Sequence, residues 1–113
     1  SIYNEDELKS TAWSSKHMYF TLVTTIGHIQ ERVLGLPDTT LNGALLDEKE
    51  KLKSVLNGIS ADYSSYSPQP NRSSTPEHLK AFIRASTLAT TDTQARVARA
   101  TYLLSVIEAS FAN

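Results

Sequence analysis

The most constraining feature of this chain is an apolar stripe near its start. Apolar side chains between positions 8 and 33 recur at steps of three and four residues, which places them on one face of an α-helix. A stripe that is this long and narrow is typical of helices packed side by side. It consists of Leu8, Ala12, Ser15, Tyr19, Leu22, Ile26, Ile29 and Val33, of which Ser15 is polar. We therefore predict one helix over residues 5–34, roughly 45 Å long.

Start and stop signals divide the rest of the chain into further helices. Asn4 and Glu7 have the spacing of a capping box, and Gly35 followed by Pro37 is a stop signal. A Ser- and Pro-rich loop covers residues 67–74, and Thr75 with Pro76 is expected to start the next helix. The sequence predicts an all-α protein, an up-down-up-down four-helix bundle that forms one domain over residues 1–113. The predicted helices are 5–34, 41–66, 76–90 and 93–112.

The stripes also predict the core and its aromatic members. Because Ile26 lies within the first stripe, Ile26→Ala is expected to lower the free energy of unfolding by about 2–5 kcal/mol. The predicted core is Leu8, Tyr19, Leu22, Ile26, Ile29, Leu45, Leu52, Leu56, Ile59, Phe82, Ile83, Leu104 and Ile107. The aromatic residues that we expect to pack between helices, rather than to hold a cofactor, are Trp13, Tyr19, Phe20, Tyr63, Tyr66 and Phe82.

Composition argues against several classes of function. The net charge of −1 lacks the basic excess that is typical of nucleic-acid-binding proteins. No apolar run reaches the roughly 18–20 residues that a membrane-spanning helix needs. Because the chain has no cysteine, disulfides, thiolate nucleophiles and cysteine-based metal sites are excluded.

Motifs for catalysis and metal binding are missing. His17, His28 and His78 lack the spacing of a metal site, and we interpret them as surface or boundary residues. The acidic residues at 5–7 fit the positive end of a helix, and those at 47–50 alternate with lysines as on a solvated helix face. No serine lies in a nucleophile motif. We predict that the chain is not an enzyme and holds no cofactor or metal.

Basic residues are the candidates for docking on a partner protein. They occur on the second, third and fourth predicted helices, where they would steer association with an acidic surface. The candidate docking residues are Lys49, Lys51, Lys53, Lys80, Arg84, Arg96 and Arg99.

One stretch resembles a known family. Residues 55–66 read VLNGISADYSSY, and Pro70 and the segment PEHLK at 76–80 follow. This order resembles the helix–loop–helix corner of a lumenal four-helix assembly-factor family of photosystem II. Here the loop is longer, and the corner joins the second and third helices rather than the last two. The chain therefore looks more like another small extrinsic subunit, the extra one of diatom-type photosystem II.

This resemblance implies a function, a partner and a location. Such a subunit is a monomer in the chloroplast thylakoid lumen, after removal of a targeting leader, and is peripheral to the membrane. It docks electrostatically on the intrinsic subunits of the photosystem II core. There it stabilises the oxygen-evolving manganese–calcium cluster by helping to retain calcium and chloride, without ligating the cluster or catalysing a reaction.

Two other functions fit the same pattern. The first is a bacterial helical immunity or adaptor protein that binds a partner protein. The second is a sensor or small-ligand-binding bundle in the bacterial periplasm, for which the small residues Ala95, Ala98 and Ala100 would leave room between helices.

Overall fold

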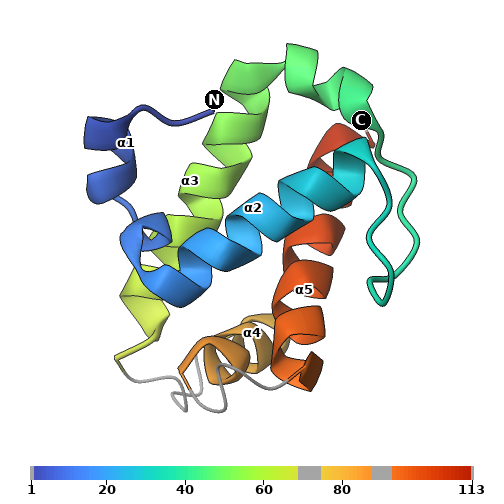
Figure 1. Ribbon diagram of the computed structural model, residues 1–113. Coiled ribbons are helices and arrows are strands. Elements are labelled where there is room, and N and C mark those ends of the chain that lie inside the picture. The colour runs from blue at the N-terminus through green and yellow to red at the C-terminus, as the bar shows by residue number, and fades with distance from the viewer. Residues whose placement is uncertain (1, 69–74, 88–92, 113) are drawn as a thin grey trace.

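A computed structural model describes residues 2–68, 75–87 and 93–112, and these residues are all-helical. Figure 1 shows α2 crossing over α3 and α5, with α4 lying across one end of the molecule. Helix α5 packs against α2, α3 and α4. The all-helical class is confirmed, whereas the up-down-up-down four-helix bundle is not. The helices are α1 (Glu5–Lys9), η1 (Ala12–Ser14), α2 (Lys16–Gln30), η2 (Gly43–Asp47), α3 (Lys49–Tyr66), α4 (Glu77–Thr87) and α5 (Thr93–Phe111), where η1 and η2 are 3₁₀ helices.

The prediction of one helix over residues 5–34 is wrong, because the chain breaks between α1 and α2. The capping box of Asn4 and Glu7 forms as predicted, but α1 ends at Lys9. The break allows Trp13 to be completely buried, with its indole Nε1–H donating to the Leu56 carbonyl at 3.2 Å. The periodicity of the stripe favours one continuous helix. Burial of the large Trp13 ring against α3 outweighs that preference.

Helix α2 ends at Gln30, before the predicted end at residue 34, because the chain turns there and folds back. His28 is buried rather than on the surface: its Nδ1 accepts from the Val33 N–H, and its Nε2 lies 2.8 Å from the Pro37 carbonyl oxygen. The Arg32 guanidinium fastens the same loop by donating to backbone carbonyls on both sides of it. These carbonyls belong to His28, Ile29, Thr39 and Leu41.

The other helix boundaries shift by smaller steps. The predicted helix over 41–66 is two elements, η2 and α3, and the Asn42 side chain caps η2. Helix α4 begins at Glu77, since the Pro76 carbonyl accepts from the Lys80 N–H. Thr75 was expected to cap this helix start, but its hydroxyl is buried and makes no hydrogen bond with the described residues, so that expectation is wrong. Residues 69–74 and 88–92, which include most of the predicted loop, lie outside the described residues.

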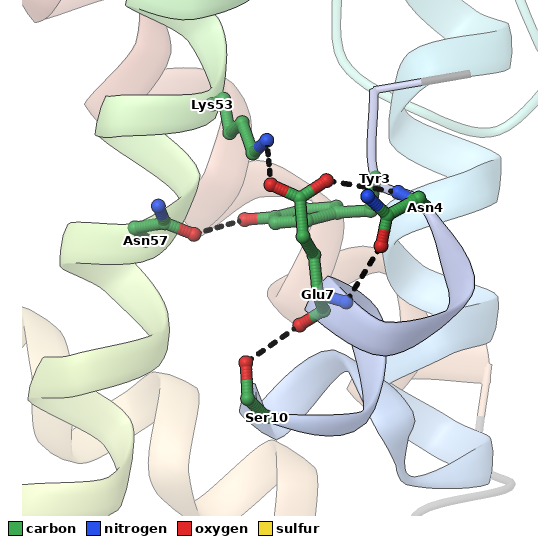
Figure 2. A network of polar contacts seen from close by, with 6 residues as sticks. All are labelled: Tyr3, Asn4, Glu7, Ser10, Lys53 and Asn57. Atoms are coloured by element: carbon green, nitrogen blue, oxygen red, sulfur yellow. Dashed lines mark hydrogen bonds and ion pairs between the residues drawn. The ribbon is translucent and has the colours of Figure 1, made fainter.

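A polar network holds the N-terminal segment against α3 (Figure 2). The Tyr3 hydroxyl donates to Asn57 Oδ1 at 2.6 Å, and Glu7 forms an ion pair with Lys53. The hydrogen bond from Lys53, together with the one from the Asn4 backbone, lowers the pKa of the Glu7 carboxyl below its usual value. No residue of α1 is fully buried, so these bonds help to orient it on the molecule.

The core draws side chains from α2, α3, α4 and α5. Most of the predicted core is buried, and Leu8 and Ile26 are partly buried against it. The prediction is wrong for Tyr19 and Phe20, whose side chains are half exposed. Tyr63 and Tyr66 pack against the core from its edge. The confirmed core residues are Leu22, Ile29, Leu45, Leu52, Leu56, Ile59, Phe82, Ile83, Leu104 and Ile107.

Candidate docking face

The outer side of α2 exposes three large apolar residues. Tyr19, Phe20 and Val23 are 49 %, 50 % and 51 % exposed. The opposite side of the same helix buries Met18, Leu22 and Ile29 in the core. Neighbouring apolar side chains left in solvent mark interaction surfaces more often than isolated ones do. We call Tyr19, Phe20 and Val23 the α2 ridge.

A hollow of about 490 Å³ lies on one side of the ridge, toward the N-terminal segment. Ile2, Tyr3 and Leu8 contribute its far wall, and η2 and the start of α3 contribute Leu46 and Lys49. Its near wall is α2 itself, through Tyr19, Leu22, Val23, Ile26, Gly27 and Gln30.

Two smaller hollows lie around Phe20, which lines both. One of about 380 Å³ lies at the start of α2, and one of about 260 Å³ lies between α2, the loop after it and α5. The first is lined by Lys16, His17, Tyr19, Phe20, Val23, Arg96 and Arg99. The second is lined by Phe20, Thr21, Thr24, Val33, Leu34, Gly35, Leu36, Thr93, Arg96, Val97 and Ala100. A partner that covers Phe20 would therefore find depressions on both sides of the ring.

The charges around the ridge have one sign. All the Lys, Arg, Asp and Glu residues that line the three hollows are Lys or Arg, and none is acidic. They are Lys16, Lys49, Arg96 and Arg99. The chain as a whole has a net charge of −1, so its acidic residues lie elsewhere on the surface. An apolar ridge with a basic surround complements a partner that presents apolar side chains among acidic ones.

Arg99 differs from the other basic residues because it is only 1 % exposed. Its Nε donates to Thr21 Oγ1 at 2.8 Å and its Nη1 donates to the Ala85 carbonyl at 2.7 Å, so it joins α5 to α2 and α4. No Asp or Glu among the described residues forms an ion pair with it. Burial, and then the nearby charge of Arg96, lower the pKa of its guanidinium.

The seven predicted docking residues do not gather in one patch. Lys49, Arg96 and Arg99 line the hollows around the ridge. Lys53 is paired with Glu7 and Lys80 with Glu77, and the Lys51 ammonium lies 4.5 Å from the centre of the Phe111 ring. Arg84 is exposed on α4 and lines none of the hollows.

The ridge itself was missed by sequence reasoning, which placed Tyr19 and Phe20 in the core. The sequence does contain a sign of the ridge. Each residue turns the helix by about 100°, so Tyr19, Phe20 and Val23 cannot all lie on the face that carries Leu22 and Ile26. Lys16 and His17 were missed as well, and only the position of α5 brings them near Arg96 and Arg99.

Comparisons with protein-family models, with curated proteins and with solved structures found no match for this chain. Within the described residues, no three His, Asp or Glu side chains are placed to hold a metal ion. In the same part of the chain, no helix has the length and apolar character to cross a membrane.

Proposed function

We propose that this chain is a non-catalytic docking protein that binds an acidic partner protein through the α2 ridge. The observation that carries this proposal is the pairing of three half-exposed apolar residues with an entirely basic set of charged neighbours. Apolar side chains of this size supply most of the binding energy at protein interfaces, and the surrounding charges increase the rate of association. The proposal does not depend on an up-down-up-down bundle, which stays a prediction.

The partner that we propose is the lumenal side of the photosystem II core. Support comes from the sequence at 55–66 and 76–80, which resembles the corner of a lumenal photosystem II family and here lies on α3 and at the start of α4. In this role the protein would be a monomer in the thylakoid lumen. It would help to retain calcium and chloride at the oxygen-evolving cluster, without holding a cofactor of its own.

Rebinding to salt-washed photosystem II particles tests both levels of the proposal. We expect saturable binding that weakens as salt is added and that raises oxygen evolution. Phe20→Ser is expected to weaken binding by about 2 kcal/mol, as removal of a central apolar anchor does. Absence of binding at low salt would overturn photosystem II as the partner.

A matched pair of lysines tests the docking face. Lys49 and Lys51 are both exposed in the first turn of α3, but only Lys49 lines a hollow beside the ridge. Lys49→Gln should slow association, whereas Lys51→Gln, which removes the same charge, should leave it unchanged. If Phe20→Ser and Lys49→Gln both bind like the parent protein, the α2 ridge is not the docking face.

A further inference from the structure

The hollow at the start of α2 is lined by more basic residues than either of the other two hollows beside the ridge. Lys16, His17, Arg96 and Arg99 all line it, and no Asp or Glu does. These residues come from two helices far apart in the sequence, since Lys16 begins α2 and Arg99 lies in α5. Like charges held this close repel one another unless a negative group lies among them.

The lack of a nearby negative charge is clearest at Arg99. A buried cation normally has a carboxylate partner, because removing a charge from water is costly. Arg99 is almost fully buried, yet its described contacts are neutral: the hydroxyl of Thr21 and the carbonyl of Ala85. Its side chain also lines the hollow. An anion in the hollow would supply the counter-charge.

The start of α2 reinforces the same preference. The Ser15 side chain makes no capping hydrogen bond, so the first-turn N–H groups of this 15-residue helix have no side-chain acceptor at their N-cap. No acidic residue lies in that first turn, and Lys16 and His17 occupy it instead. Helix starts attract negative groups through these N–H donors and through the helix dipole. The first turn of α2 therefore carries basic residues where a helix usually carries acidic ones.

Apolar side chains make up another part of the lining and would contact the apolar part of a ligand. Tyr19, Phe20 and Val23 form one wall, and the Arg96 guanidinium lies 5.5 Å from the centre of the Phe20 ring. At about 380 Å³ the hollow falls within the range of about 300–1,000 Å³ that small-molecule sites occupy. An inorganic ion would leave this apolar wall uncovered.

We propose that this hollow binds a small organic anion. A carboxylate would lie among Arg99, Arg96 and Lys16, and an aromatic or aliphatic body would cover Phe20 and Val23. The planar guanidinium groups suit a carboxylate, which accepts two parallel hydrogen bonds. This site does not require the docking function, because it concerns the isolated chain and a small ligand.

Titration of the isolated protein with phenylacetate at low ionic strength tests the proposal by NMR. We expect saturable shifts of the Arg99 Nε–H and Val23 methyl signals. Lys16→Gln and Arg96→Gln, which alter exposed residues, should each weaken binding about tenfold, as loss of a charged hydrogen-bond donor does. The control Lys51→Gln removes a charge outside the hollow and should change the dissociation constant less than twofold.

Two comparison ligands separate the parts of the proposal. Benzyl alcohol has the aromatic body without the charge, and inorganic phosphate has charge without the body. Both should bind more weakly than phenylacetate. Equal binding of benzyl alcohol would overturn the role of the cations, and equal binding of phosphate would overturn the role of the apolar wall. No saturable shift with phenylacetate at millimolar concentrations would overturn the site, whatever the result with photosystem II.

Discussion

Single polar side chains decide how the irregular segments of this protein lie on its helices. Arg32 and His28 hold the loop after α2, and Tyr3 holds the segment before α1. Tyr3 is 8 % exposed, and its burial is the main cause that raises the pKa of the hydroxyl to about 12, with the charge of Glu7 acting in the same direction. The neutral hydroxyl is therefore the form that the folded state prefers.

This preference predicts alkaline sensitivity. In the unfolded chain Tyr3 loses its proton near pH 10, and in the folded chain near pH 12, so its contribution to stability is complete below pH 10 and is lost as the pH rises from 10 through 12. Tyr3→Phe removes this titration and should cost about 1 kcal/mol at neutral pH, where the bond to Asn57 is lost.

Urea unfolding of both proteins across this pH range measures the effect. The advantage of the parent over Tyr3→Phe in unfolding free energy should fall as the pH rises above 10 and should reverse as the pH approaches 12, because a shift of about two pKa units is worth more than the bond to Asn57. A constant difference would mean that Tyr3 ionises equally easily in the folded and unfolded states.

Helix α2 illustrates how one element divides its faces between core and solvent. Ile29 is 1 % exposed, whereas Ile26, one turn earlier, is only partly buried and lines the hollow beside the N-terminal segment. Both residues belong to the same stripe in the sequence. Leu22 and Ile29, before and after Ile26 in the stripe, are both buried, so the difference arises because Ile26 borders the hollow beside the N-terminal segment.

Two alanine substitutions test this division. Ile29→Ala should lower the free energy of unfolding by about 3 kcal/mol, because a fully buried side chain leaves a cavity. Ile26→Ala should cost about half of that, less than the stripe alone predicts, because the hollow already admits water beside Ile26. Urea denaturation followed by circular dichroism gives both values. Equal losses would indicate that Ile26 is packed as tightly as Ile29.

At the scale of the whole molecule, one apolar core connects all the longer helices. It includes Trp13 before α2, Leu56 in α3, Phe82 in α4 and Leu103 in α5. Arg99 adds polar bonds among α2, α4 and α5. With a core shared in this way, no helix has a separate set of contacts that would survive the loss of the others.

Unfolding should therefore occur in one step. The fluorescence of Trp13, which reports on the contact with α3, and far-ultraviolet circular dichroism, which reports on all helices, should give the same urea midpoint within error. Phe20→Ser, which changes an exposed residue, should move this midpoint only slightly. Two separate transitions would show that α4 and α5 unfold independently of the N-terminal half.

The candidate site was only partly predictable. The basic residues Lys49, Arg96 and Arg99 were singled out from sequence, and the structure places them beside the α2 ridge. The exposed apolar residues of the ridge were not, because a hydrophobic side chain on a helix is first taken as part of the core. Whether such a side chain is exposed depends on which neighbouring elements cover it, and that is a property of the packed molecule.

By itself, the sequence determined the helical class, the capping box at Asn4 and most of the predicted core, because these follow from local periodicity and from hydrogen bonds between near neighbours. Only the tertiary structure decided the break before α2, the burial of His28 and the meeting of Lys16 with Arg99. Each of these depends on contacts between residues distant in the chain. Their energies, unlike helical periodicity, leave no regular pattern in the order of residues.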